Sequence, residues 1–292
     1  MISKEILKKV KQIQIHTRHI VNDFMTGKYE SVFKGRGIEF HEVREYSPGD
    51  DVRTIDWNVT ARMGHPYIKL FSEERELTVM LIVDLSSSGD FASTNRLKRE
   101  LATELSAVLA LSAMTSNDKV GLIVHTDRVE KFVPPKRGKH HLLRVIRDLL
   151  AFEPVHKGTD IGAALEYLNR VTTRRAVVFL ISDFITSGYD KQLKVANKRH
   201  DVIAIEITDP REMQLPRVGM VYLEDAETGE RIFVDTSNSL VRKKYRRRFD
   251  ESRKQLHSRL RSMGVDIISV GTGESYIQPI IKFFKIRAGR WR

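Results

Sequence analysis

Residues 78–89, which read Thr-Val-Met-Leu-Ile-Val-Asp-Leu-Ser-Ser-Ser-Gly, decide the fold of this chain. The first six are apolar or β-branched without polar alternation, a pattern typical of a strand buried on both faces of a parallel sheet. The strand ends in a carboxylate, Asp84, and two hydroxyls follow at alternate positions, Ser86 and Ser88. We therefore expect a central strand whose carboxyl end presents oxygen ligands.

Five further segments have the composition of strands and alternate with amphipathic helical patterns. They are residues 119–126, 129–133, 176–182, 201–208 and 265–270. The second of these is expected to be an antiparallel edge strand. The alternation predicts right-handed crossovers and an α/β fold with a doubly wound, mostly parallel six-stranded sheet, Rossmann-like in its winding. Two short strand patterns around a Gly-containing turn predict a β-hairpin inserted near residues 219–236.

Two other loops could bring oxygen atoms to the same edge of the sheet. Thr159 precedes a helical pattern, where it could instead be an N-cap, and Asp183 follows a second buried strand. The carboxyl ends of such strands converge at the topological switch point of an open α/β sheet. Hydroxyl and carboxylate oxygens suit a hard cation, and magnesium usually completes its shell with water or a partner's oxygen. The candidate ligands of Mg²⁺ or Mn²⁺ are therefore Asp84, Ser86, Ser88, Thr159 and Asp183.

The spacing of these residues resembles the metal-ion-dependent adhesion site of von Willebrand factor A domains. The resemblance rests on Asp-x-Ser-x-Ser at 84–88, the threonine about seventy residues later and the aspartate at the end of another strand. It implies a non-enzymatic, Mg²⁺-dependent protein-binding module in which a partner's Asp or Glu carboxylate takes the open position on the ion. The chain departs from many such domains in having Phe184, rather than glycine, after Asp183.

A second motif lies nearer the N-terminus. Residues 44–57 read Arg-Glu-Tyr-x-x-Gly-Asp-Asp-x-Arg-x-Ile-Asp-Trp, and Thr-Ala-Arg follows at 60–62. This pattern resembles the bacterial family called domain of unknown function 58, from about residue 35 to the C-terminal helix. The resemblance implies a MoxR-type AAA+ ATPase as the partner, and with it a chaperone-like role in assembling or maturing another complex.

Residues 1–75 are expected to form a subdomain of one helix and short strands, and residues 76–292 the von Willebrand factor A-like domain. Apolar residues at helical spacing predict a helix over 2–25. Alternating patterns over 37–46 and 65–71 predict a small sheet packed beside the main one. The aspartates and arginines between these two strands are expected to form charge pairs that lock an irregular segment, in preference to an acid–base site.

Composition excludes several classes of protein. The 292 residues are 41% hydrophobic and 30% charged, as in soluble globular proteins. No apolar run reaches the ~18 residues that a membrane span needs, and charges interrupt the N-terminal segment too often for a secretory signal. We therefore expect a cytoplasmic protein. The absence of cysteine excludes disulfides, zinc thiolates and cysteine nucleophiles, and no phosphate loop, His-Glu-x-x-His or Gly-x-Ser-x-Gly motif is present.

The net charge of +12 is concentrated in two segments. Residues 242–261 carry ten Lys or Arg against two carboxylates, and residues 1–20 carry five against one. An electrostatic partner should therefore approach these two predicted helices. The apolar stripe of residues 241–263 predicts that the second helix packs on the sheet. Two alternative functions stay open: nucleic-acid binding through residues 242–261, and a metal-dependent hydrolase, for which no base or nucleophile stands out.

Overall fold

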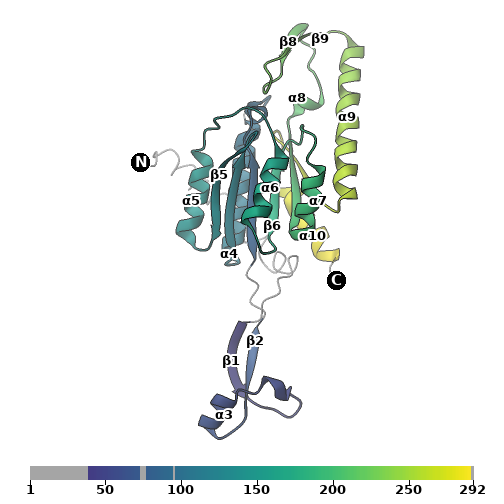
Figure 1. The fold of residues 1–292 in the computed structure, drawn as a ribbon. Helices are drawn as coiled ribbons and strands as arrows, with labels where there is room; N and C mark the ends of the chain where they lie inside the picture. The colour runs from purple at the N-terminus through teal and green to yellow at the C-terminus, as the bar shows by residue number, and fades with distance from the viewer. Residues whose placement is uncertain (1–38, 73–76, 95, 291–292) are drawn as a thin grey trace. The chain divides into compact units, whose positions relative to one another are not determined.

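The computed structural model describes residues 39–72, 77–94 and 96–290 (Figure 1). Contacts divide the chain into two compact units, one of which is Lys34–Leu77, while the other holds everything described from Thr78 onward. The helix predicted over residues 2–25 lies outside the described residues. Within the described ranges, no helix combines the length and the apolar character that a membrane span requires.

A six-stranded sheet forms the larger unit. Its strands lie in the order β10 (Asp266–Gly271), β7 (Asp201–Thr208), β6 (Val177–Ser182), β3 (Thr78–Asp84), β4 (Lys119–His125) and β5 (Val129–Lys136). All neighbouring strands are parallel except β4 and β5. The predicted α/β class and mostly parallel six-stranded sheet are thus confirmed. Because the chain adds β4 and β5 on one side of β3 and then β6 on the other, the switch point lies between β3 and β6.

Helices cover both faces of this sheet (Figure 1). The helices of the unit are η2 (Ser87–Asp90), α4 (Lys98–Thr115), α5 (Lys139–Leu150), α6 (Ile161–Val171), α7 (Asp190–Arg199), α8 (Pro210–Met213), α9 (Ser239–Ser262) and α10 (Ile277–Arg290). Strand β6 shows how the sequence fills both layers, since side chains alternate along a strand. Phe179 packs toward Phe284 of α10, whereas Val178 and Leu180 join the core formed with α6 and α7.

Helix α9 differs from its prediction in the first half. Leu256 and Leu260 near its C-terminus are buried, but Val241, Tyr245 and Phe249 are only half-buried. A helix of 24 residues is about 36 Å long, whereas a strand of six to eight residues spans about 20–27 Å. The first half of α9 therefore extends past the sheet, beside the antiparallel hairpin of β8 (Met220–Glu224) and β9 (Arg231–Asp235). The prediction that this helix packs on the sheet is therefore correct only for its second half.

The smaller unit is an antiparallel pair, β1 (Glu39–Glu45) and β2 (Tyr67–Ser72), with η1 (Val52–Thr54) and α3 (Trp57–Met63) between the strands. Arg44 donates two hydrogen bonds to Asp50, at 2.8 and 2.9 Å. The side chain of Asp51 caps η1, and that of Asp56 caps α3. Asp56 also lies 3.3 Å from the ammonium group of Lys69. The predicted charge pairs therefore form only in part and with other cations, because no ion pair among the described residues joins Asp50, Asp51 or Asp56 to Arg53 or Arg62.

His200, at the C-terminal end of α7, makes stability depend on pH. Its buried ring accepts a hydrogen bond at Nδ1 from the backbone N–H of Ala176, at 3.3 Å. Burial, together with the charges of Arg199 and Arg175, lowers the pKa of His200 from 6.5 to about 4. As the pH falls below 6.5, the unfolded state therefore binds a proton that the native state does not bind until about pH 4. The stabilisation is complete above pH 6.5 and is lost across this window.

We expect the wild type to lose about 2 kcal/mol more unfolding free energy than a His200→Gln variant between pH 7.5 and pH 5. Glutamine keeps an acceptor for the Ala176 N–H but does not titrate. Urea titrations of both proteins at the two pH values measure the difference. Parallel losses in the two proteins would show that another group controls this transition.

Candidate metal centre

The candidate ligands lie at the carboxyl ends of β3 and β6, where the strand order reverses. Asp84 is the last residue of β3, Ser86 is the N-cap of η2, Ser88 lies within η2, and Asp183 follows β6. The two serine hydroxyls are 3.0 Å apart. These four side chains line one cavity of about 20 Å³. Such a volume holds a single water-sized atom, so one ion would fit.

Thr159 is the fifth candidate, and the loop that carries it is hydrogen-bonded to the two loops that line the cavity. The N–H of Ser87 donates to the carbonyl of Lys157 at 3.0 Å. The hydroxyl of Thr186, just after Asp183, donates to the carbonyl of Thr159 at 3.4 Å. Three segments far apart in sequence therefore meet at this edge of the sheet, although Thr159 itself is not among the residues that line the cavity.

The hydroxyl of Thr159 is bonded to the β8–β9 hairpin. It does not cap α6, because Asp160 is the N-cap and accepts the N–H of Ala163 at 2.9 Å. Instead it donates to Oε1 of Glu227 at 2.6 Å. Burial raises the pKa of Glu227, the Thr159 hydrogen bond opposes this shift, and the nearby carboxylates of Asp84 and Asp183 add to it. The turn of the hairpin thus brings a further carboxylate to the loop that carries Thr159.

Asp84 is held by two hydrogen bonds. Its Oδ1 accepts the N–H of Ser86 at 3.0 Å, and its Oδ2 accepts the hydroxyl of Ser182 at 2.7 Å. The Ser182 hydroxyl in turn accepts the N–H of Phe184 at 3.0 Å. Phe184 has φ 57°, in the left-handed region that favours glycine. The loop after β6 therefore keeps a backbone conformation suited to glycine at residue 184, although this residue carries a buried aromatic ring.

A buried lysine neutralises Asp183. Lys98, the first residue of α4, is 3% exposed, and its Nζ lies 2.7 Å from Asp183 and 2.5 Å from Glu212 of α8. Burial opposes the charge of this ammonium group, but attraction by both carboxylates prevails and raises the pKa of Lys98. The second oxygen of Asp183 accepts the N–H of Ile185 at 3.3 Å. Asp183 is consequently better placed to reach an ion through water than directly.

The oxygen atoms around the cavity are chemically suited to a hard divalent cation. Carboxylate and hydroxyl oxygens are ligands that magnesium accepts, with water in the remaining positions. In the part of the chain that the structure describes, no three His, Asp or Glu side chains are grouped closely enough to hold a metal by themselves. Hydroxyls would therefore have to supply part of the shell, as the Asp-x-Ser-x-Ser pattern predicts.

Sequence reasoning missed Ser182 and Lys98, which line this cavity, as well as Glu212, which pairs with Lys98, and Glu227, which bonds to Thr159. Ser182 had a signal, since it is a hydroxyl residue at the end of a buried strand, next to Asp183. Lys98 and Glu212 are separated by 114 residues and Glu227 is 68 residues from Thr159, so no local pattern relates them.

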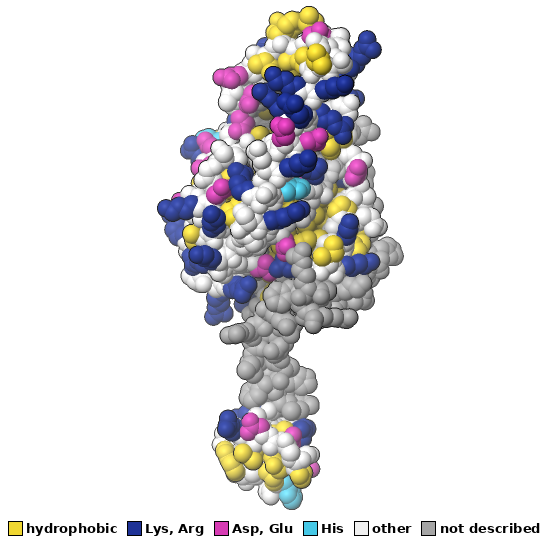
Figure 2. Space-filling model, turned by 90° about the vertical axis from the view of Figure 1, so that its right-hand side faces the viewer, with side chains coloured by type: hydrophobic (Ala, Val, Ile, Leu, Met, Phe, Trp, Pro, Cys, Tyr) yellow, Lys and Arg dark blue, Asp and Glu magenta, His cyan; other side chains and the backbone are white. Residues whose placement is uncertain are grey.

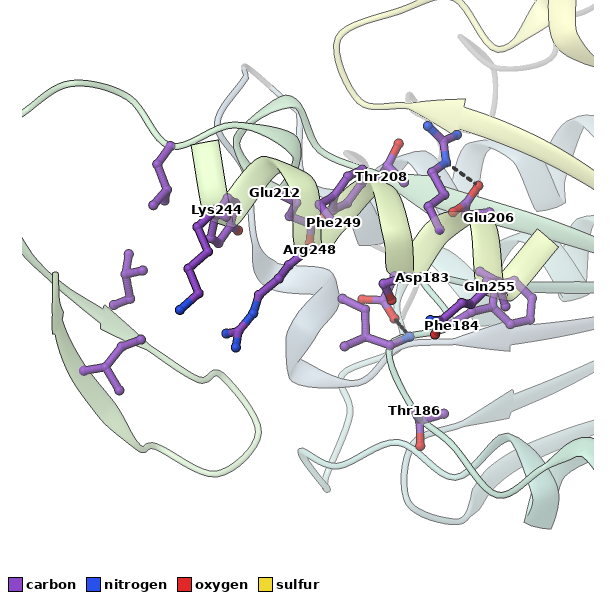
Figure 3. Close-up of a pocket in the computed structure, with 18 of the residues that line it drawn as sticks. Asp183, Phe184, Thr186, Glu206, Thr208, Glu212, Lys244, Arg248, Phe249 and Gln255 are labelled. Atoms are coloured by element: carbon purple, nitrogen blue, oxygen red, sulfur yellow. Dashed lines mark hydrogen bonds and ion pairs between the residues drawn. The ribbon is translucent and has the colours of Figure 1, made fainter. Parts of the chain in front are cut away.

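A groove of about 1040 Å³ adjoins the site and shares Asp183 with it. It lies between α9, the β8–β9 hairpin and the ends of β6 and β7, and Lys244 and Arg248 project from α9 into it (Figure 3). Figure 2 shows Lys and Arg gathered on the face that carries α9, with hydrophobic side chains at the hairpin end. Tyr222 of the hairpin is 72% exposed. This combination of cations and exposed apolar groups suits an acidic, partly apolar protein surface.

Part of the charge of α9 is engaged within the chain. The arginines that form ion pairs or hydrogen bonds within the chain include Arg242, Arg246, Arg247, Arg253 and Arg259. Arg253 pairs with the buried Glu206, and Arg259 donates to the hydroxyl of Tyr189 at 2.7 Å. These contacts reduce the charge that the helix could offer to nucleic-acid phosphates.

The fold and the loop cluster define a class: an α/β domain with a mostly parallel six-stranded sheet and oxygen-bearing loops at the switch point of that sheet. The chain belongs to the family described as "Protein of unknown function DUF58", which matches residues 42–255.

Two relatives show the extent of the family. The Mycobacterium tuberculosis protein Rv1480 is 30% identical over 283 residues, which cover 95% of this chain and 88% of that protein. The Bacillus subtilis protein YeaD is 23% identical over 181 residues, or 60% of this chain and 42% of YeaD.

Solved structures with partial similarity include BatB from Bacteroides thetaiotaomicron, with a TM-score of 0.47 and 19% identity, covering 73% of this chain and 99% of BatB. The VWA domain of SpRpn10 has a TM-score of 0.39 and 11% identity, covering 70% of this chain and 94% of that domain.

Proposed function

We propose that this protein is a non-enzymatic, Mg²⁺-dependent protein-interaction module of the cytoplasm. Asp84, Ser86 and Ser88 would hold Mg²⁺, or Mn²⁺, and Thr159 and Asp183 would reach it directly or through water. The observation that carries the proposal is the convergence of Asp84, Ser86, Ser88 and Asp183 on one ion-sized cavity at the switch point. When bound, the ion supplies an electrophilic position for a carboxylate of the partner.

The surroundings of the cavity support a protein as the ligand. Val155 and Ile185, on two of the loops at this edge, are 80% and 72% exposed. Exposed apolar side chains near a polar centre are typical of interaction surfaces. Neither carboxylate of the cavity is placed as a general base, because Asp84 accepts two hydrogen bonds and Asp183 is paired with Lys98. These contacts favour binding over hydrolysis.

The proposed partner is a MoxR-type AAA+ ATPase, with which the module would take part in the assembly or maturation of another complex. The partner would place an Asp or Glu side chain on the ion and an acidic face near Lys244 and Arg248 of α9. The family resemblance of residues 44–62 motivates this choice of partner, and the cations of α9 supply the charge that such a face would complement.

An Asp84→Ala variant is expected to bind Mg²⁺ at least about tenfold more weakly than the wild type, because it loses a charged ligand. Isothermal titration calorimetry with magnesium chloride measures the effect. Thermal unfolding in chelator verifies that the variant is folded. The matched control is Asp90→Ala, which removes an exposed carboxylate that pairs with Arg99 in the same segment. A wild type without Mg²⁺ affinity, or equal affinities in Asp84→Ala and wild type, would refute the metal centre.

The partner is tested with the purified MoxR-type ATPase of the same organism. Wild type and Asp84→Ala are compared for retention on the immobilised ATPase, both in Mg²⁺, so that the nucleotide chemistry of the ATPase is unaffected. We expect retention of the wild type alone. Equal retention of the two proteins would place the contact elsewhere on the chain.

A further inference from the structure

The turn of the β8–β9 hairpin contacts the loop that carries Thr159, one of the candidate ligands. Glu227 lies in this turn, and its Oε1 accepts the hydrogen bond of Thr159 at 2.6 Å. Its Oε2 would be 4.0 Å from a Cβ atom added to Gly158. A carboxylate from the hairpin therefore lies directly on the loop that carries a candidate ligand, although no sequence motif relates the two.

The turn fixes the position of Glu227. The side chain of Asp225 accepts the N–H groups of Glu227 and Thr228, each at 2.9 Å. The N–H of Gly229 donates to the carbonyl of Asp225 at 2.8 Å, and its φ of 73° is one that glycine adopts without strain. The two strands remain paired along their whole length. Glu227 thus lies in a turn whose conformation is fixed by hydrogen bonds, at the end of a paired hairpin.

The predicted ligands bring little uncompensated negative charge to the candidate centre. Asp183 is paired with Lys98 at 2.7 Å, and the serine and threonine hydroxyls are neutral. Among the described residues, Asp84 is the predicted carboxylate ligand that makes no ion pair with Lys or Arg. Magnesium is usually bound in proteins through one or two carboxylates. Glu227, next to Thr159, is in a position to be the second.

We propose that Glu227 is a ligand of the ion and holds the hairpin against the metal centre. This inference rests on the proposed function, because it requires the ion. While Glu227 occupies its position beside Thr159, the hairpin turn covers that side of the centre. A partner carboxylate can then bind the ion only if it displaces the hairpin turn. The hairpin therefore selects partners that bind both the hairpin and the ion.

Calorimetric titration with magnesium chloride compares the wild type, Glu227→Gln and Glu230→Gln. Glu230 lies in the same turn, and its replacement removes the same charge, but its backbone makes hydrogen bonds with Thr228 and Asp225 and not with Thr159. We expect Glu227→Gln to bind Mg²⁺ about tenfold more weakly or worse, and Glu230→Gln to bind it as the wild type does.

Hydrogen–deuterium exchange of residues 220–235 provides a readout that does not depend on affinity. We expect Mg²⁺ to slow exchange in the hairpin of the wild type and of Glu230→Gln, but not in Glu227→Gln at a saturating Mg²⁺ concentration. If Glu227→Gln binds Mg²⁺ as tightly as the wild type and gains the same protection, the inference is wrong and the proposed function stands. If the wild type does not bind Mg²⁺, both are wrong.

Discussion

Replacing Lys98 with alanine is expected to lower the free energy of unfolding by about 3–5 kcal/mol, because one buried and one largely buried carboxylate lose the ammonium group that is bonded to both of them. Lys98 is 3% exposed, and its Nζ is bonded to both Asp183 and Glu212. Burial already raises the pKa of Glu212, and Lys98 opposes that shift. Without the ammonium group, two like charges face each other away from water. Urea unfolding at neutral pH measures the loss.

The control for Lys98 is Arg231→Ala, which breaks the 2.6 Å ion pair with Glu224 on the hairpin. Both partners of that pair are well exposed, so we expect a loss below about 1 kcal/mol. A Lys98→Met variant keeps most of the side-chain volume and should also be strongly destabilised, since the cost comes from charge. A loss in Lys98→Ala no larger than in Arg231→Ala would refute the role of the buried cation.

A Phe184→Ala variant is expected to lose about 3–5 kcal/mol of unfolding free energy, the usual cost of truncating a buried phenylalanine. The ring of Phe184 is 5% exposed and lies 6.2 Å from that of Tyr189, centroid to centroid. The control is Phe91→Ala, because Phe91 is 42% exposed and its truncation should cost much less. Similar losses at the two positions would contradict the assignment of Phe184 to the core.

Phe184→Gly provides a sharper comparison at the same position. Alanine is normally favoured over glycine by about 0.5–1 kcal/mol in regular structure, but a left-handed residue with a Cβ atom is strained by about 1–2 kcal/mol. Because φ is 57° at Phe184, we expect the glycine variant to be at least as stable as the alanine variant. Parallel urea unfolding of the two variants decides the order, and a clearly more stable alanine variant would show that the backbone here is not strained.

Continuous apolar runs made the central strands predictable. Strands β3 and β6 are buried along their length because helices cover both faces of the sheet, and such strands have no polar alternation. The antiparallel edge strand β5 was predictable from the short connection that follows β4. Helix α9 was predicted as a helix from its periodicity, but a stripe of apolar residues does not reveal how far a helix extends past its sheet.

The residues that line the cavity were predictable as candidate ligands where they are close in sequence or end a strand. Asp84, Ser86 and Ser88 lie within five residues, and Asp183 follows a buried strand, so strand order alone brings them together. The left-handed backbone of Phe184 was not predictable, because the sequence shows only that the usual glycine is replaced. Only the folded chain shows that its ring is buried while its backbone keeps the glycine conformation.

The sequence by itself thus determined the α/β class, the strands and the loops that meet at the switch point, because periodicity and strand ends are local properties of the chain. The tertiary structure decided which charges meet there. Lys98 joins Asp183 and Glu212 across 85 and 114 residues, and Thr159 meets Glu227 across 68. Such pairs depend on distances through space, which packing of the whole sheet and hairpin sets and no local pattern encodes.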